Sequence, residues 1–335
     1  MISFLLALAS LSQSPSDGHA LKPPVLKTNE TVGLIAPASP LDEASVRGAV
    51  RYLRQAGYGV KLSYGYRQAQ GYLAGSDESR AAELNAMFRD PQVKAIVCLR
   101  GGYGSPRILD RIDYALLEKN PKVLVGYSDI TALLNAIHAK TAMVVFHGPM
   151  AKELSEGLTP FTSRYFWSAF QPRSALFDDW GHGLPESKSR LTTVVPGQAE
   201  GVLVGGNLSV VTCTLGTPYE IKTQGAILFL EEVSEKPYRI DRMLNHLRLS
   251  GKLAQVRGVL LCRFTNCEPA AENDSGLETI FKDYFGELGV PVLAGFPAGH
   301  VPDQVTLPVG IRVRLDATAR KLTLLESTVT TAEPK

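Results

Sequence analysis

The chain lacks the cysteine and histidine patterns that mark disulfide-rich and metal-binding proteins. Only four cysteines occur among 335 residues, too few for the disulfide framework of a small secreted domain. Cys98, Cys213 and Cys262 lie within apolar runs, which predicts buried thiols, and Cys267 lacks metal-ligand spacing from Cys262. The six histidines form neither an H-x-H nor an H-E-x-x-H pattern. The sequence therefore gives no support for a metal site.

A strong charge of one sign and long apolar runs are also lacking. The formal net charge is +2 and no dense lysine or arginine run occurs, which argues against a nucleic-acid partner. No apolar segment reaches the roughly 18 residues that a membrane span needs.

The N-terminus permits two interpretations. Residues 1–10 are almost entirely apolar, and small and polar residues follow up to Gly18, an arrangement that is typical of a short export signal. However, no lysine or arginine precedes the apolar stretch, and a plain extension ahead of the first domain is the alternative. We treat residues 1–22 as this extension or signal, so the localisation stays open between the cytoplasm and export.

What the sequence does contain is a regular alternation of short apolar strands and amphipathic helices from Thr31 onward. Apolar residues recur at i, i+3, i+4 and i+7 from Val46 and again from Ile130, and a further helix is expected over Ile108, Ile112 and Leu116. Continuous apolar strands between such helices predict a parallel sheet covered on both faces, a doubly wound α/β domain of the flavodoxin or Rossmann type. The expected strands are 32–36, 59–63, 95–99, 123–125 and 143–146.

The regular alternation of apolar strands and amphipathic helices ends in the second half of the chain. Residues 151–196 contain several prolines and both tryptophans, which indicates a connecting segment with some helix. We therefore expect an N-terminal α/β domain over 23–150, this connection over 151–196, and a C-terminal mixed α/β domain over 197–335. The expected strands of the last domain are 201–204, 226–230, 258–261 and 291–293, followed by a hairpin of 311–315 with 321–325.

Ser128 directly follows an apolar strand and directly precedes a helical segment. Ligands of open parallel sheets bind at the carboxyl ends of the strands, and the free amides at a helix start favour negative charge. This placement resembles a nucleophile elbow, in which the amide of the next residue, Asp129, would help to stabilise an oxyanion. The usual G-x-S-x-G pattern lacks its second glycine here, and a simple helix cap is the alternative.

A glycine-rich loop, Arg100–Gly104, ends the preceding strand. Its backbone can approach a ligand closely and supply an N–H group, although a simple tight turn explains it as well. The loop matches neither the G-x-G-x-x-G fingerprint nor the phosphate-binding pattern with its lysine.

A serine nucleophile needs a base and a carboxylate that orients it. Glu231 and Glu232 follow one apolar strand and His300 follows another, and the order serine, acid, histidine occurs in one class of triads. A solvated strand end and an exposed loop histidine are the alternatives, and His138 and His147 compete as bases. Spacing alone does not bring these groups together.

Seven stretches of the chain resemble motifs of the LD-carboxypeptidase family of serine peptidases, relatives of which also hydrolyse microcin C-type toxins. They occur in the family's order between about residues 23 and 325, and their combination is far more specific than any one of them. The stretches are Gly33–Pro40, Arg100–Gly104, Gly126–Thr131, Gly205–Ser209, Leu228–Glu232, Pro237–Leu244 and Gly295–His300.

The resemblance implies a serine-type LD-carboxypeptidase that releases the terminal D-alanine from peptidoglycan stem tetrapeptides, with its active site in a cleft between two domains. Ser128 would be the nucleophile, His300 the base and Glu231, rather than Glu232, the orienting acid. The amides of Asp129 and Gly102 would be the oxyanion donors.

The resemblance also has implications for the substrate, cofactors and partners of this protein. It implies a small peptide or muropeptide substrate and no cofactor, and family members often form homodimers. The two open alternatives are a hydrolase that confers immunity to microcin C-type toxins and a two-domain peptide-binding protein without catalysis. The candidate substrate-binding residues are Arg100, Gly101, Tyr103, Asn207 and Arg239.

Overall fold

The computed structural model describes residues 20–172, 191–269 and 276–331. Most of the expected extension over residues 1–22 lies outside this part of the chain. Among the helices of the described ranges, none has the length and apolar character that crossing a membrane requires.

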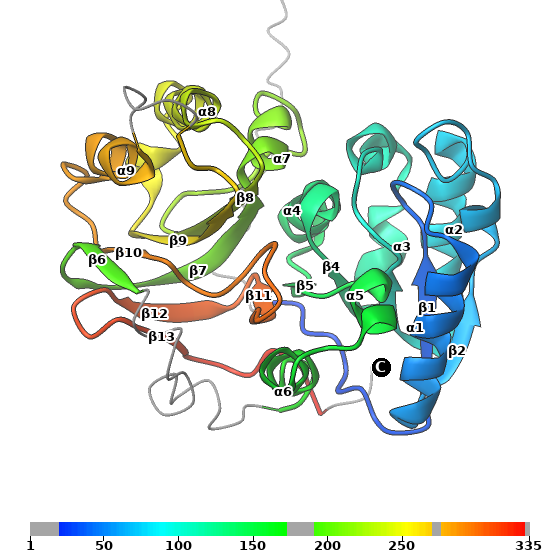
Figure 1. Cartoon of the computed structure of the whole chain (residues 1–335). Coiled ribbons are helices and arrows are strands. Elements are labelled where there is room, and N and C mark those ends of the chain that lie inside the picture. The colour runs from blue at the N-terminus through cyan, green and yellow to red at the C-terminus, as the bar shows by residue number, and fades with distance from the viewer. Residues whose placement is uncertain (1–19, 173–190, 270–275, 332–335) are drawn as a thin grey trace, which may run out of the picture.

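The first sheet has five parallel strands and one antiparallel strand at its edge (Figure 1). The parallel strands are arranged in the order 2-1-3-4-5, which is the flavodoxin-type order. The predicted doubly wound α/β class is therefore confirmed. The strands are β1 (Thr31–Ile35), β2 (Gly59–Leu62), β3 (Val93–Cys98), β4 (Val123–Gly126), β5 (Val145–His147) and the edge strand β11 (Leu307–Val309).

Helices cover both faces of this sheet (Figure 1). One face carries α1 (Glu43–Gln55) and α5 (Ala151–Glu156), and the other carries α2 (Asp77–Arg89), α3 (Tyr114–Lys119) and α4 (Thr131–Thr141). The side chains of Asp42 and Ser76 accept hydrogen bonds from the amides three residues ahead, and so each caps the start of its helix.

The prediction of one helix over Ile108, Ile112 and Leu116 is wrong. The segment instead forms a 3-10 helix, η2 (Ser105–Arg111), followed by the separate helix α3. The backbone of Ile112 is extended, and the Asp113 side chain accepts the Leu116 amide at 3.0 Å. This cap starts a new helix in the middle of the apolar stripe.

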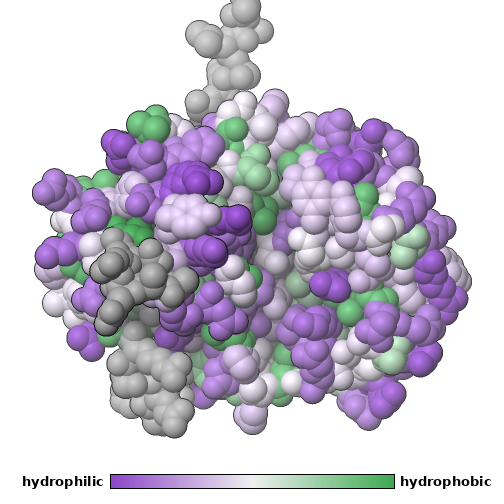
Figure 2. All heavy atoms as spheres, turned by 45° about the horizontal axis from the view of Figure 1, so that its top comes forward, coloured by the Kyte–Doolittle hydropathy of each residue, from purple (hydrophilic) through white to green (hydrophobic). Residues whose placement is uncertain are grey.

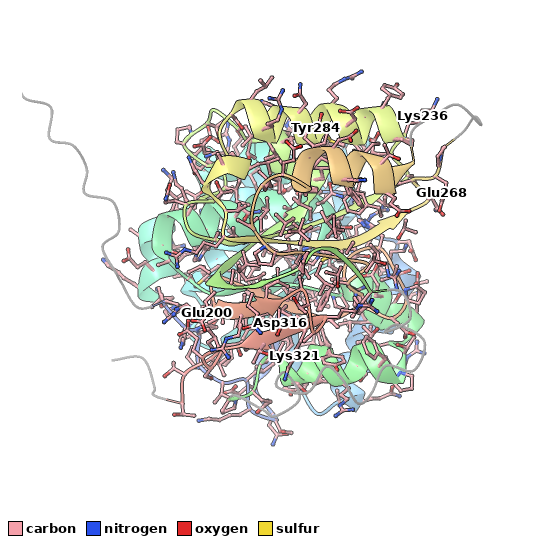
Figure 3. All side chains as sticks on the ribbon, turned by 90° about the vertical axis from the view of Figure 1, so that its left-hand side faces the viewer. Glu200, Lys236, Glu268, Tyr284, Asp316 and Lys321 are labelled. Carbon is pink, nitrogen blue, oxygen red and sulfur yellow. The ribbon has the colours of Figure 1, made fainter. Side chains whose placement is uncertain are left out.

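The second sheet is mixed, as predicted. Its strand order is β13-β12-β7-β8-β9-β10-β6, in which β7 to β10 are parallel and the others antiparallel. The predicted closing hairpin is confirmed, with Asp316 paired to Lys321 (Figure 3). The strands are β6 (Thr192–Val195), β7 (Gln198–Asn207), β8 (Ile227–Val233), β9 (Gly258–Thr265), β10 (Val292–Ala294), β12 (Arg312–Asp316) and β13 (Lys321–Leu324).

One face of this sheet packs against three helices, α7 (Leu208–Cys213), α8 (Pro237–Leu249) and α9 (Leu277–Phe285). Figure 3 shows α8 and α9 together on that side, where Tyr284 of α9 hydrogen-bonds to Asp241 of α8. The prediction of a buried thiol is confirmed for Cys98 and Cys262 but is wrong for Cys213, which is exposed. The buried residues of α7 are Leu208, Val211 and Thr212, and Cys213 lies off that helical stripe.

The two sheets form one packed unit. A single hydrophobic cluster continues from the helices of the first sheet to inward-facing residues of the second, such as Ile227 and Phe229. The edge strand β11 comes from late in the sequence, yet it pairs with β5 of the first sheet. The helix α6 (Pro160–Ser168) and the strand β6 lie within the segment expected to connect the domains.

Candidate active site

Ser128 lies on a strained turn between β4 and α4. Its φ of 61° is in the left-handed region, which costs a non-glycine residue on the order of 1 kcal/mol. Gly126 lets this turn close, because a Cβ built there would lie 2.7 Å from the Ile130 side chain. The Ser128 side chain caps neither the short 3-10 helix η3 (Ser128–Ile130) nor α4. The helix-cap alternative is therefore wrong, and the Ser128 hydroxyl has no hydrogen-bond partner among the described residues.

The glycine-rich loop lies directly against this turn. A Cβ on Gly101 would come within 2.9 Å of Ser128 Oγ and 3.2 Å of the Asp129 amide nitrogen. The Ser105 amide donates to Asp129 Oδ2 at 2.8 Å, and the Ser105 hydroxyl donates to the Asp129 carbonyl. Within the described residues, the amides of Gly102 and Asp129 donate to no other group. Two free N–H groups thus lie on the segments that flank the serine.

The carboxyl group of Asp129 holds these two segments together rather than facing solvent. Burial raises its pKa, while the hydrogen bond from the Ser105 amide acts in the opposite direction. The predicted role for Asp129 concerned its amide alone. The side-chain contact adds a reason why the loop and the turn keep a fixed spacing.

Arg80 is a supporting residue that the sequence analysis missed. Its guanidinium is fully buried and donates to the carbonyls of Pro37 and Gly104, the latter at 2.8 Å. It also pairs with Asp77. The glycine loop is thereby tied to the loop that follows β1. No signal in the sequence reveals this, because an arginine in a surface helix is expected to be solvated.

Glu231 and His300 meet in the structure. Glu231 lies near the end of β8 and is fully buried, and its Oε2 is 2.8 Å from His300 Nδ1. Gly299 makes this approach feasible, because it has a φ of +100° and a Cβ there would lie 2.5 Å from Glu231 Oε2. The loop is held further by the Thr265 hydroxyl, which donates to the His300 carbonyl at 3.0 Å.

The electrostatic environment of His300 suits a base. Burial lowers its pKa, but the hydrogen bond and the charge of Glu231 outweigh this effect, so the pKa is raised above the ordinary value of 6.5. In the neutral ring, Nδ1–H donates to the carboxylate and Nε2 keeps its lone pair. In that tautomer, Nε2 is the ring nitrogen with a lone pair available for a proton.

Glu232 has a different set of partners. Its Oε1 accepts the Asn207 side-chain amide at 2.8 Å, and its Oε2 accepts the amide and the hydroxyl of Ser209 at 2.9 and 2.6 Å. Burial raises its pKa, opposed by these hydrogen bonds. Adjacent strand residues point to opposite faces, which explains why one glutamate reaches the histidine and the other holds the start of α7. Asn207, a predicted substrate-binding residue, is engaged in this second network.

The contacts between the two halves bring His300 to the serine turn. Thr131 Oγ1 accepts the Asn207 amide at 3.1 Å, and the Asn135 side chain donates to the Gly205 carbonyl at 2.9 Å. The ring of Tyr127, the residue before Ser128, lies 4.8 Å from the His300 ring, measured between centroids. No hydrogen bond joins Ser128 to His300 in the structure.

Three predicted substrate-binding side chains lie at the surface. Arg100 is half-buried at the end of β3 and has no ion-pair partner among the described residues. The exposed Arg239 of α8 hydrogen-bonds to Tyr238 of the same helix and to Glu235, which precedes the helix. Tyr103 lies within the glycine loop and makes an edge contact with Tyr72, another exposed aromatic.

Hydrophilic residues dominate the face that is turned forward in Figure 2, and hydrophobic residues form only small separate patches on it. A broad apolar docking surface is therefore absent from this face of the described chain.

The competing histidines do not have the partners of a base. His138 Nδ1 lies 3.2 Å from the Met143 carbonyl, near the end of α4 remote from the serine turn. His147 is fully buried, and burial lowers its pKa to about 3. Neither ring nitrogen of His147 has a hydrogen-bond partner within the described residues. His300 is thus the histidine of these three that pairs with a carboxylate.

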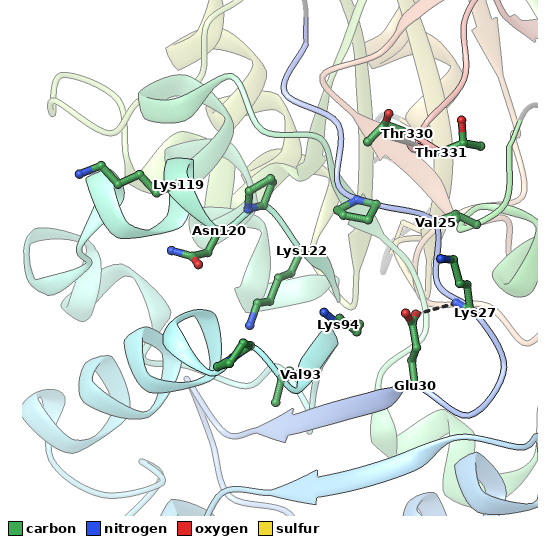
Figure 4. A pocket seen from close by; sticks show the side chains of 13 residues that line it. Val25, Lys27, Glu30, Val93, Lys94, Lys119, Asn120, Lys122, Thr330 and Thr331 are labelled. Atoms are coloured by element: carbon green, nitrogen blue, oxygen red, sulfur yellow. Dashed lines mark hydrogen bonds between the residues drawn. The ribbon is translucent and has the colours of Figure 1, made fainter. Parts of the chain in front are cut away.

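A separate cavity of about 330 Å³ lies at the amino ends of β3 and β4 (Figure 4). Lysines dominate its charged lining, but the amine of Lys122 already donates to the carbonyls of Met87 and Asp90 at the end of α2. Burial lowers the pKa of Lys122 to about 8. This cavity is at the opposite ends of the strands from Ser128, and so it does not hold the groups described above.

The chain matches two family models, the LD-carboxypeptidase N-terminal domain over residues 32–148 and the LD-carboxypeptidase C-terminal domain over residues 200–315. It is 44% identical to the probable murein peptide carboxypeptidase of Bacillus subtilis over 311 residues, which are 92% of this chain and 95% of the relative. The two-domain fold and these matches identify the chain as a carboxypeptidase. The chain belongs to the LD-carboxypeptidase family, as its motifs indicate.

Solved structures agree with this assignment. The muramoyltetrapeptide carboxypeptidase from Oxalobacter formigenes has a TM-score of 0.75 and 32% identity, covering 88% of this chain and 97% of that one. The microcin C7 self immunity protein MccF, solved with aspartyl sulfamoyl adenosine, has a TM-score of 0.83 and covers 92% of this chain and 99% of its own. Its identity of 23% makes it a match of fold alone.

Proposed function

We propose that this protein is a serine-type LD-carboxypeptidase that releases the terminal D-alanine from peptidoglycan stem tetrapeptides. The observation that carries the proposal is the 2.8 Å contact between buried Glu231 and His300, formed beside the strained turn of Ser128. The relatives named for murein peptides and muramoyltetrapeptides support the substrate class.

In the proposed reaction, Ser128 Oγ attacks the carbonyl carbon of the amide bond that precedes D-alanine, and His300 Nε2 accepts the hydroxyl proton. Glu231 holds Nδ1–H and stabilises the imidazolium that forms. The amides of Asp129 and Gly102 donate to the oxyanion. The intermediate collapses as the C–N bond breaks and His300 protonates the leaving amine. Water, activated by His300, then hydrolyses the acyl-enzyme.

The reaction requires Ser128 and His300 to come within hydrogen-bonding reach once substrate is bound. Catalytic hydrogen bonds are often long before the substrate arrives and tighten in its complex. A guanidinium pairs well with a carboxylate, and we assign Arg100 to the terminal carboxylate of the substrate because it has no ion-pair partner in the described chain.

The test is to incubate the purified protein with a stem tetrapeptide and to measure released D-alanine by mass spectrometry. We expect turnover by the unmodified protein and a loss of about 10⁴-fold or more in kcat for Ser128→Ala and for His300→Ala. The double variant should lose little more than either single variant, because the groups act as a unit. Equal turnover by the protein and Ser128→Ala would refute the assignment.

Two further outcomes would select the alternatives. Cleavage of an aminoacyl sulfamoyl nucleotide, with the tetrapeptide left intact, would indicate a toxin-immunity hydrolase. Saturable tetrapeptide binding by calorimetry, without D-alanine release, would indicate a binding protein.

A further inference from the structure

Tyr127 is the residue through which the serine turn contacts the base. It immediately precedes Ser128 in the chain, and its ring lies 4.8 Å from the ring of His300 at an interplanar angle of 59°. The side chain is 6% exposed. The Tyr127 ring is thus buried and packs against one side of the imidazole.

The Tyr127 ring is itself fixed at its far end. Its hydroxyl donates to Glu153 Oε1 at 3.0 Å, and Glu153 Oε2 accepts the amide of Met150 at 2.9 Å. The second contact places Glu153 in the first turn of α5. The orientation of the ring is therefore set by a helix start that contains none of the proposed reacting groups.

A second layer supports the same ring from behind. The His147 ring lies 5.9 Å from that of Tyr127 and 5.2 Å from that of Phe229, both in edge-to-face arrangements. His147 is fully buried and both of its nitrogens are unpartnered among the described residues. These contacts make it a packing group here, and Tyr127 is held between it and His300.

The hydrogen bond to Glu231 fixes only Nδ1 of His300 and leaves the ring free to swing about that contact. The Tyr127 ring beside the imidazole restricts this rotation. Tyr127 and the nucleophile Ser128 are adjacent residues, so the position of the Tyr127 ring also fixes the spacing of base and serine. We propose that Tyr127, anchored by Glu153, is the positioning residue that aims His300 Nε2 at Ser128; this inference rests on the proposed function.

The direct test replaces the aromatic ring of Tyr127 with a large apolar side chain. In Tyr127→Leu we expect kcat to fall about 100-fold with KM within about threefold of the unmodified protein, because small misplacements of reacting groups cost rates of this order. Tyr127→Phe keeps the ring and loses only the anchor, so its kcat should fall about fivefold. Wild-type kcat in Tyr127→Leu would overturn the proposal.

The pH profile separates positioning from simple packing. The charges of Glu231, Glu232 and Glu153 raise the pKa of His300, and Glu231 alone of these contacts its ring. The neighbouring imidazole of His147 is coupled to His300 by charge. Burial is the largest influence on the pKa of His300 and lowers it. Water admitted by Tyr127→Leu reduces that effect, so the acid limb of kcat/KM should move to higher pH. An unchanged limb would assign Tyr127 to structure only.

A double-mutant cycle keeps the inference testable if Tyr127→Leu does not fold. Tyr127→Phe and Glu153→Ala each remove the same hydrogen bond, so their effects on kcat should not add in the double variant. Additive losses would contradict the anchoring role of Glu153.

The labelling rate of Ser128 by a fluorophosphonate gives a readout that does not require the tetrapeptide. Ser128→Ala is the blank. If the unmodified protein is labelled but ignores the tetrapeptide, the substrate assignment fails while the positioning is still measured. We expect Tyr127→Leu to be labelled at least tenfold more slowly than Tyr127→Phe. Equal labelling rates would overturn the positioning role alone.

Discussion

At the level of single residues, the adjacent glutamates of β8 have separate partners, and this difference predicts separate phenotypes. Glu231→Ala removes the acceptor of His300 Nδ1, and we expect kcat to fall about 10³- to 10⁴-fold. Glu232→Ala removes the acceptor of Asn207 and Ser209. We expect this change mainly to lower the free energy of unfolding, by about 2–4 kcal/mol.

Steady-state kinetics and denaturant unfolding of both variants would measure these effects. Glu231→Gln and Glu232→Gln serve as size-matched controls. A larger loss of kcat in Glu232→Ala than in Glu231→Ala would show that the orienting acid is wrongly assigned.

The pH dependence of activity follows from the same residue pair. The base must be neutral to accept a proton, and the pKa of His300 is raised above 6.5 by Glu231. The acid limb of kcat/KM in the free enzyme should therefore lie above pH 6.5. Glu231→Gln removes the negative charge and should shift this limb to lower pH. A wild-type limb well below pH 6.5, measured with a soluble tetrapeptide, would contradict this electrostatic account.

The raised pKa of His300 also makes the stability of the fold depend on pH. A histidine whose pKa is raised in the folded state stabilises the fold below its unfolded pKa, and this contribution disappears as the pH rises through the folded pKa.

At the level of elements, the loop after β10 depends on Gly299. Gly299→Ala combines a left-handed backbone at φ +100° with a Cβ 2.5 Å from Glu231 Oε2. Gly157→Ala is the matched control, because its φ is +86° and no atom lies within 4 Å of the added Cβ. Both variants should lose about 1 kcal/mol of unfolding free energy from backbone strain.

Only Gly299→Ala should also lose activity, by about 100-fold, because its methyl group displaces the carboxylate that orients His300. Thermal unfolding and D-alanine release distinguish the two effects. Similar activity in both variants would mean that the contact between Gly299 and Glu231 is not needed.

The elements that the sequence predicted well are those with strong local signals. Four of the five parallel strands contain continuous apolar runs, and β2, which includes Lys61, is the exception. The closing hairpin alternates around a short polar loop, so pattern alone indicated these elements. The strand β11 gave no such signal, because it has three residues including Pro308 and its partner Phe146 is distant in sequence. Proline is tolerated there because β11 is an edge strand.

The candidate site likewise has parts that the sequence predicted and parts that it did not. The turn of Ser128 and the glycine loop were visible as local patterns at strand ends. The pairing of Glu231 with His300 was implied by the family resemblance and not by spacing. Arg80 and Tyr127 were invisible as supporting groups, because their roles depend on what folds against them.

At the level of the whole molecule, polar contacts between α4 and β7 hold the two halves in register. Thr131→Val leaves the amide of Asn207 without its acceptor, and Thr141→Val does the same to the amide of Met143 within the first half. Both threonines are buried on α4. Each change should lower the free energy of unfolding by about 1–3 kcal/mol.

Only Thr131→Val should reduce kcat beyond the loss of folded protein, by about tenfold, because it alone loosens the half that carries His300. Turnover normalised to Ser128 labelling measures this difference. Identical normalised turnover in the two variants would show that the contact between α4 and β7 has no part in aligning the site.

The edge strand β11 has a consequence for synthesis of the protein. Translation proceeds from the N-terminus, and β5 leaves the ribosome long before residues 307–309 exist. At roughly 5–20 residues per second, this interval lasts on the order of ten seconds. Throughout it the outer edge of β5 is uncovered and open to wrong strand partners. The nascent first half therefore has to be shielded, or to stay unfinished, until nearly the last residues are added.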